Sequence, residues 1–185
     1  LNFLDMPVFF APKKLAFNYI YEYLKKNSGN LIISGGKSIK GLLNSKIKYL
    51  NLNDRKILLS DERLVKKNSN LRNDKVFYNL IKKKIIKKKN FFNYEKEYYD
   101  EKYIKNFSTR IKKINFKIAI MGLGSNGHIA SIFNDTYKSS KIFYNVTKSP
   151  KRPKNRVTVS INKNKKTHKI FLLAKKKTKK KEIKN

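Results

Sequence analysis

The sequence predicts an α/β protein in which a mostly parallel, Rossmann-like sheet is covered by helices on both faces. Short apolar, β-branched segments alternate along the chain with longer segments whose apolar residues recur at helical spacing. Glycines follow two of the apolar segments directly, as expected where a strand ends in a ligand-binding loop. We therefore expect residues 1–185 to form one domain, with residues 175–185 as a basic tail or an incomplete helix.

The first third of the chain sets up this alternation. Apolar positions at helical spacing predict a helix over residues 13–26, and leucines at the same spacing predict a second helix after Lys37. Compact apolar runs bounded by polar residues predict the strands around them. The expected strands are Met6–Phe10, Asn30–Ser34 and Arg55–Ser60.

The rest of the chain continues the pattern. Apolar stripes predict helices over residues 69–89 and 93–113, with the lysine triplets near residue 85 on the solvated face and end of the first. A β-branched run at 116–121 reads as a strand buried on both faces, and the chain after His128 is compatible with a further helix. The remaining expected strands are Ile142–Val146, Val157–Ile161 and His168–Ala174.

Composition limits the functional classes. No apolar run approaches the roughly 18 residues that cross a bilayer, and the beginning of the sequence lacks the pattern of a secretory signal. The absence of cysteine excludes disulfides and thiolate chemistry, and fits a reducing compartment. We expect a cytoplasmic protein, and the sequence leaves its oligomeric state open.

The net charge of +34 invites a nucleic-acid interpretation, because phosphate backbones bind lysine-rich surfaces. The basic residues are however spread along the whole chain, and only six of the 46 are arginine, the residue suited to reading phosphates and bases. We interpret the excess of lysine as compositional drift. Nucleic acid is then expected to bind only non-specifically, and no membrane partner is expected.

Glycines mark the first candidate site, where Gly35 and Gly36 lie between an expected strand and an expected helix. Backbone N–H groups at a helix start form an anion site, and Lys37 and Ser38 add donors. The triplet Gly-Lys-Ser resembles the end of a nucleotide-binding P-loop, but Leu31 stands where that motif requires another glycine. We therefore expect an anion-binding loop, with a simple chain turn as the alternative.

Two further strand ends carry chemically capable side chains. Asp61-Glu62-Arg63 follows the strand at 55–60, and the alternative for this triplet is a solvated loop in which Asp61 caps a turn. Gly122, Gly124 and Gly127 precede His128. Because parallel strands share the direction of their carboxyl ends, these groups should meet the glycine loop at one edge of the sheet. Together they predict a site for a phosphorylated small molecule, with chemistry resting on His128.

The chain resembles the 6-phosphogluconolactonase family, within the wider fold group of glucosamine-6-phosphate deaminases and ribose-5-phosphate isomerases. Four blocks carry the resemblance in family order: Leu31–Ser38, Leu59–Asn70, Gly122–Phe133 and Ser149–Ile161. The related deaminases have tyrosine at the position of Arg63, and their histidine block continues differently from Ala130–Phe133. The lactonases are therefore the more similar branch.

The resemblance implies hydrolysis of 6-phosphoglucono-1,5-lactone to 6-phosphogluconate without a cofactor or metal. The implied catalytic group is His128, the general base, with Asn126, Asp61 and Arg63; the implied phosphate-binding residues are Gly35, Gly36, Lys37, Ser38, Lys151, Arg156 and Lys179. A lactone is an activated ester, so a base for water and donors for the developing oxyanion suffice.

The sequence departs from the family pattern at several positions. Asn126 replaces the aspartate that orients the histidine, Lys37-Ser38-Ile39 replaces Ser-Thr-Pro in the phosphate loop, and the C-terminal part is expected to be short. These departures keep two alternatives open. One is a phosphosugar deaminase or isomerase, and the other is a non-catalytic relative whose charge serves nucleic acid.

Overall fold

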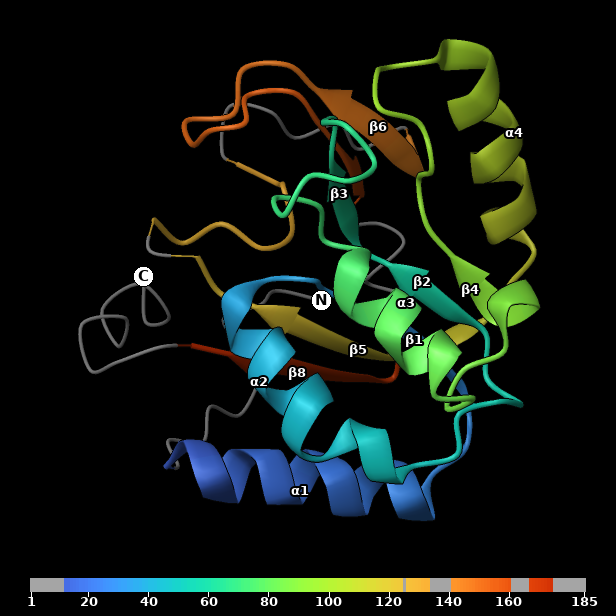
Figure 1. Ribbon diagram of the computed structural model, residues 1–185, viewed down its shortest axis with the longest axis vertical. Coiled ribbons are helices and arrows are strands. Elements are labelled where there is room, and N and C mark those ends of the chain that lie inside the picture. The colour runs from blue at the N-terminus through green and yellow to red at the C-terminus, as the bar shows by residue number, and fades with distance from the viewer. Residues whose placement is uncertain (1–11, 125, 134–140, 161–166, 175–185) are drawn as a thin grey trace.

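The computed structural model describes residues 12–124, 126–133, 141–160 and 167–174 (Figure 1). Two expected segments, the strand at residues 6–10 and the tail at 175–185, lie outside the described residues. The other expected strands are present, each within about two residues of its predicted range.

A five-stranded parallel sheet forms the centre of the structure, in the order β4-β2-β1-β5-β8. Its strands are β1 (Asn30–Ile33), β2 (Ile57–Leu59), β4 (Phe91–Phe92), β5 (Phe116–Gly122) and β8 (Lys169–Leu173). Each named strand pair is parallel, so the carboxyl ends of β1, β2 and β5 lie at the same edge, as the sequence predicted.

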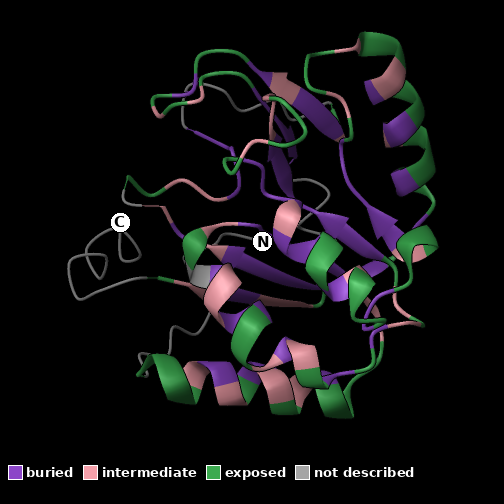
Figure 2. Ribbon diagram, viewed as in Figure 1, coloured by how far each residue is buried: buried purple, intermediate pink, exposed green. Residues whose placement is uncertain are grey.

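Both faces of this sheet are buried, which explains the nearly continuous apolar strand sequences. Leu31 and Ile33 of β1 join one hydrophobic cluster, whereas Ile32 between them joins another on the opposite face. All three side chains are fully buried. In Figure 2 the strands of this sheet are mostly purple, the colour of buried residues, whereas the outer faces of the helices carry the green of exposed residues.

Helices cover the sheet on both faces, as predicted. The residues of α1 (Lys13–Lys26), α2 (Lys37–Ser45) and α3 (Lys75–Lys82) pack on one face, next to the short 3-10 turns Ile47–Tyr49 and Lys88–Asn90. The buried side chains of α4 (Glu101–Lys112) pack on the other. The fold class expected from the sequence is therefore confirmed (Figure 1).

A second, antiparallel sheet shares the face that α4 covers. It has the order β3-β7-β6 and consists of β3 (Asp61–Arg63), β7 (Arg156–Val159) and β6 (Phe143–Val146). Strand β3 follows β2 after the single residue Ser60, whose backbone oxygen accepts a hydrogen bond from Val159 N at 2.8 Å. The alternative interpretation of Asp61-Glu62-Arg63 as a solvated loop is thus wrong, because β7 pairs with this segment and Asp61 and Glu62 are buried.

The expected helix at 69–89 is shorter than predicted. It begins at Lys75 and ends at Lys82, because Lys84 adopts a left-handed conformation with φ of 57°. Ile85 N donates to Leu80 O and Lys84 N donates to Ile81 O, which is the hydrogen-bond pattern that closes a helix C-terminus. Because α3 ends at Lys82, the following residues are free to form β4, a two-residue strand that was not predicted from the sequence.

The next helix also begins later than predicted. Asp100 accepts a hydrogen bond from Tyr103 N at 2.8 Å and caps α4, which starts at Glu101 rather than near residue 93. Tyr94 is buried outside the helix, whereas Tyr98 is exposed.

A helix immediately after His128 was also expected, and the structure corrects this. Residues 129–133 form turns stabilised by isolated bridges, from Leu123 to Ile129 and from Ile129 to Ile132. Ala130 in this segment has φ of 54°. The turn directs the chain back toward the antiparallel sheet, where Ser131 N donates to Thr158 Oγ1.

Candidate active site

Three strand ends meet at one edge of the parallel sheet and supply most of the candidate residues. Gly35 lies two residues beyond β1, Asp61 two residues beyond β2, and Gly124 two residues beyond β5. Ser34 Oγ and Ser60 Oγ hydrogen bond at 2.9 Å, and Ser34 N donates to Ile120 O. The three strand ends are therefore joined, as the shared direction of parallel strands predicts.

The carboxylate of Asp61 is held by three side-chain hydrogen bonds. Its side chain is buried and accepts hydrogen bonds from Ser60 Oγ at 3.0 Å, Ser131 Oγ at 2.7 Å and Asn73 Nδ2 at 3.3 Å. These partners come from three separate segments of the chain, and all of them are uncharged. The carboxylate is thus fixed in place by neutral donors.

The glycine loop fits closely against the same centre. A Cβ added at Gly35 would lie 2.5 Å from Asn73 Cβ and 2.6 Å from Asn73 O, so only glycine allows this approach. Gly36 precedes the first residue of α2, and its backbone oxygen accepts from Ile39 N and Lys40 N. The backbone N–H groups of Lys37 and Ser38 belong to the first turn, where no intrahelical acceptor exists. These two N–H groups are available at a helix N-terminus, and anion binding by them stays a prediction.

His128 is held by three neighbours from its own loop. A side chain at Gly124 would overlap the imidazole ring, and Gly124 N donates to His128 O at 2.8 Å. Nδ1 of His128 contacts the amide oxygen of Asn126 in a short hydrogen bond. The ring also packs against Phe133, with centroids 4.7 Å apart. Since an amide oxygen only accepts, Nδ1 carries the proton and Nε2 is the basic nitrogen.

Two arginines lie opposite each other on the antiparallel sheet, where Arg63 of β3 is paired with Arg156 of β7. The guanidinium of Arg156 lies 5.9 Å from the centroid of the Phe133 ring that also contacts His128. Burial lowers the pKa of Arg156; the charge of Asp61 opposes this effect, and the charge of Arg63 adds to it. Two like charges placed together at this edge favour an anionic ligand.

Arg63 supports the same interpretation. Its Nη1 donates to Leu71 O at 2.8 Å, whereas its Nε is buried without a hydrogen-bond partner among the described residues. A buried donor without an acceptor is costly, and a bound ligand oxygen is the simplest partner.

The remaining predicted phosphate-binding residues have fewer described contacts with this site. Lys37 is exposed at the start of α2, and the side chain of Ser38 and all of Lys179 lie outside the description. Lys151 is half-buried in the loop before β7, where its backbone oxygen accepts from Arg156 Nη2 at 3.0 Å. Their phosphate-binding roles stay predictions.

The sequence analysis missed a buried charge network directly behind the site. Arg72 Nη2 donates to Asp74 Oδ2 at 2.7 Å and lies 3.6 Å from Glu62 Oε2. Glu62 also accepts from Asn73 N at 2.7 Å and Asp74 N at 2.9 Å, at the start of α3. This network fixes Asn73, which in turn donates to Asp61. Neither charge pattern nor periodicity indicated that Arg72 would be buried.

Stability is expected to depend on pH through Glu62. Burial, and then the neighbouring charge of Asp74, raise the pKa of Glu62 from an ordinary value of 4.5 to about 8, although Arg72 opposes this. The unfolded chain releases the proton at the lower pH, whereas the folded protein retains it. The free energy of unfolding should therefore fall as pH rises between about 4.5 and 8, and level off above.

The variant Glu62→Gln isolates this effect, because glutamine does not titrate. Urea unfolding of both proteins from pH 5 to 9 should show the wild type losing stability relative to the variant as pH rises. A constant difference across this range would contradict the assigned shift.

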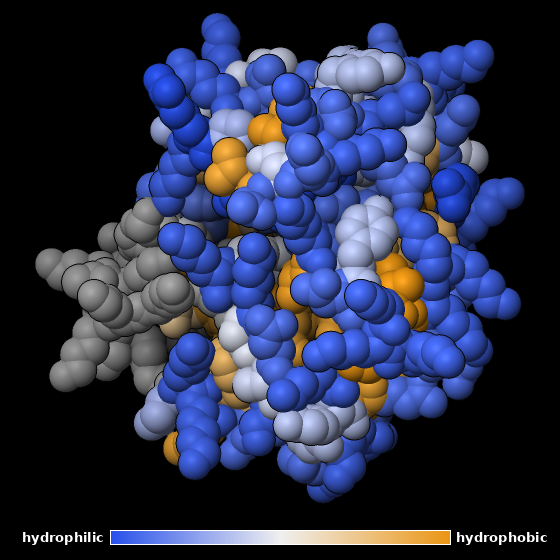
Figure 3. Space-filling view, in the orientation of Figure 1, coloured by the Kyte–Doolittle hydropathy of each residue, from blue (hydrophilic) through white to orange (hydrophobic). Residues whose placement is uncertain are grey.

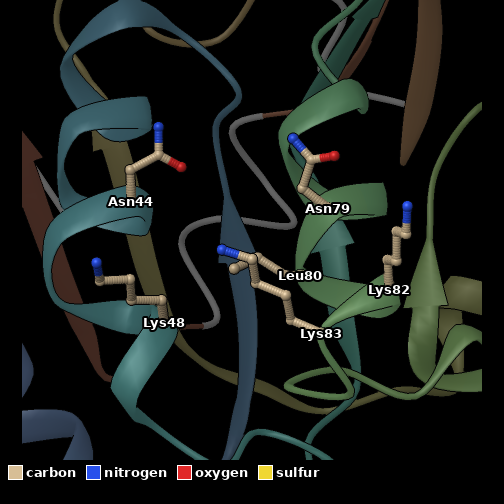
Figure 4. A pocket seen from close by; sticks show the side chains of 6 residues that line it. All are labelled: Asn44, Lys48, Asn79, Leu80, Lys82 and Lys83. Carbon is tan, nitrogen blue, oxygen red and sulfur yellow. The ribbon is translucent and has the colours of Figure 1, made fainter.

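The described surface offers other features that do not belong to this site. A pocket of about 210 Å³ lies between α2 and α3, and Figure 4 shows side chains of both helices around it. Its lining residues are Asn44, Lys48, Asn79, Leu80, Lys82 and Lys83, which include no general base or nucleophile suited to neutral pH. Hydrophilic side chains cover most of the face in Figure 3 without gathering into one band.

Within the described ranges, no three or more His, Cys, Asp or Glu side chains are grouped so that they could hold a metal ion. No helix in that part of the chain has the length and apolar character needed to span a bilayer.

Known proteins resemble this chain in sequence and in fold. A family model described as glucosamine-6-phosphate isomerases/6-phosphogluconolactonase matches residues 14–185. A 6-phosphogluconolactonase of Mycobacterium leprae is 34% identical over 62 residues, which cover 32% of this chain and 25% of that protein. This sequence match thus spans about a quarter of the length of the curated relative.

Solved structures show the same fold over most of the chain. The 6-phosphogluconolactonase of Thermotoga maritima superposes with a TM-score of 0.75 and 23% identity, covering 91% of this chain and 82% of that one. The enzyme of Leishmania guyanensis gives a TM-score of 0.76 and 18% identity, covering 95% and 83%. At these identities the likeness demonstrates the fold.

Proposed function

We propose that this chain, which belongs to the family of glucosamine-6-phosphate isomerases and 6-phosphogluconolactonases, hydrolyses 6-phospho-D-glucono-1,5-lactone to 6-phosphogluconate. The observation that carries the proposal is that the imidazole of His128 and the guanidinium of Arg156 both lie against the ring of Phe133. A general base and a cationic side chain that can bind a phosphate are therefore close together at this edge of the sheet. A phosphorylated ester that is attacked by water needs both groups.

His128 acts as the general base in this mechanism. Its Nε2 takes a proton from water as the water oxygen bonds to the lactone carbonyl carbon. The tetrahedral intermediate then collapses, and the bond between that carbon and the ring oxygen breaks. The protonated His128 returns its proton to the departing ring oxygen, so the catalyst is regenerated and the acid product ionises to 6-phosphogluconate.

Charged and backbone donors stabilise the anionic parts of the reacting molecule. The proposed phosphate ligands are the N–H groups at the start of α2, the guanidinium of Arg156 and the ammonium groups of Lys37, Lys151 and Lys179. Arg63 Nε, which lacks an acceptor among the described residues, is suited to the lactone or its developing oxyanion. Asp61 links the segments that carry these groups, because its carboxylate accepts hydrogen bonds from Ser131 and Asn73.

Direct assay tests the proposal. Purified protein should hydrolyse 6-phosphogluconolactone faster than the spontaneous background, measured as acid release at neutral pH. Release of ammonia from glucosamine-6-phosphate without lactone hydrolysis would instead identify a deaminase. Absence of both activities would favour a non-catalytic relative. We place the reaction in the cytoplasm and expect nucleic acid to bind only through net charge.

Asn126 determines how strongly His128 can act as a base. Its amide oxygen orients the imidazole but carries no charge to stabilise the protonated ring. Asn126→Asp should therefore raise kcat several-fold and move the lower limb of the pH–rate profile to higher pH, because a carboxylate favours the imidazolium. A variant with the wild-type pH profile would argue against His128 as the titrating base.

A further inference from the structure

We propose that Ser131 is a positioning residue that connects Asp61 to Arg156 while keeping them apart, so that the Arg156 guanidinium remains available to the substrate phosphate. This inference rests on the proposed function, since it assumes a phosphorylated substrate.

Among the described residues, the hydroxyl of Ser131 is the side-chain group that hydrogen bonds to both Asp61 and Arg156. It donates to Asp61 Oδ2 at 2.7 Å, and it accepts from Arg156 Nη1 at 3.5 Å. Ser131 is 0% exposed, so it is shielded from solvent and from a ligand in the site. Its effect on the reaction must therefore pass through its two neighbours.

The side chains of Asp61 and Arg156 each hydrogen bond to neutral groups instead of to each other. No ion pair within 4.0 Å joins them in the described part of the chain. Arg156 donates instead to backbone oxygens: Nε to Pro153 O at 3.0 Å, and Nη2 to Lys151 O at 3.0 Å and Arg152 O at 3.3 Å. Carbonyl acceptors orient a guanidinium without neutralising it. Its positive charge is thus preserved for an anionic ligand.

The local backbone has an unusual conformation that brings Ser131 to this position. Ala130 adopts φ of 54°, a left-handed conformation that costs a non-glycine residue roughly 1–2 kcal/mol. The turn closes with Ile132 N donating to Ile129 O, and Ser131 N donates to Thr158 Oγ1 of β7. Such strain persists where the surroundings require the geometry. Here it turns the hydroxyl of Ser131 inward between the two charges.

Removal of the hydroxyl should change phosphate recognition specifically. In Ser131→Ala, Asp61 and Arg156 lose their shared partner and can approach each other directly, which draws the guanidinium away from the phosphate. We expect KM for 6-phosphogluconolactone to rise roughly tenfold, as for a lost charge-assisted hydrogen bond. The kcat/KM for unphosphorylated gluconolactone should fall much less, because that substrate has no phosphate to lose.

The experiment compares both lactones in wild type, Ser131→Ala and Ser131→Cys. The cysteine variant replaces the hydroxyl by a thiol, which is a weaker donor, and should be intermediate. Ser45→Ala is the control, because Ser45 is exposed at the end of α2 and donates only to Gly41 O. Calorimetric titration with 6-phosphogluconate and with gluconate gives a second readout, in which only the phosphorylated compound should bind more weakly.

The outcomes separate this inference from the proposed function. An inactive wild type would overturn the proposed function. An active wild type whose Ser131→Ala variant changes equally toward both lactones, or toward neither, would overturn the positioning role alone.

Discussion

Replacement of His128 by alanine is expected to return the rate of lactone hydrolysis close to the spontaneous background. A positioned general base contributes about 10²–10⁴-fold, and His128 is the only histidine at the strand ends where the candidate residues meet. The fold should survive the change, because the ring is only partly buried and packs against Phe133 at the rim of the site.

The chain offers a matched control for this variant. His168, the other of its two histidines, is exposed beside β8, and its backbone N–H donates to Lys117 O. Alanine keeps that backbone hydrogen bond, so His168→Ala should retain wild-type kcat and KM. Full activity in His128→Ala, with both variants folded by circular dichroism, would remove His128 from the mechanism.

Replacement of Arg72 by alanine should be among the most destabilising single changes in this structure. The side chain is 1% exposed, and it donates to Asp74 and to Tyr94 O at 2.8 Å, with Glu62 beside it. Breaking a buried pair by removing one partner costs about 3–5 kcal/mol, because the Asp74 carboxylate stays buried without its partner. Urea unfolding at constant pH should show this loss.

Lys88→Ala provides the contrast at the surface. Lys88 forms an ion pair with Glu95 at 2.8 Å, but both side chains are about half exposed. Exposed pairs contribute about 0–1 kcal/mol, so this variant should unfold near the wild-type midpoint. Similar losses in Arg72→Ala and Lys88→Ala would show that the buried network contributes little. If Arg72→Ala folds, its activity should also fall, since Asn73 between Arg72 and Asp74 supports Asp61.

The sequence by itself determined the class of fold and the positions of the main candidate residues. Alternation of β-branched runs with helical stripes placed the strands, because a strand buried on both faces must be apolar throughout. Gly35, Asp61 and His128 could then be assigned to strand ends, and parallel strands bring such ends to one edge. These are local patterns, and each can be recognised within about ten residues of the sequence.

Only the tertiary structure decided which polar residues are buried together. The two-residue strand β4 and the end of α3 at Lys82 depend on contacts with β2 and on a left-handed cap, which no periodicity encodes. Ser131, Asn73 and Arg72 resemble ordinary loop residues in the sequence, yet each lies beside a charged partner from a different segment. Burial is a property of the assembled layers rather than of a residue. The groups that position the site therefore became recognisable only once β7 had paired with β3 and enclosed them.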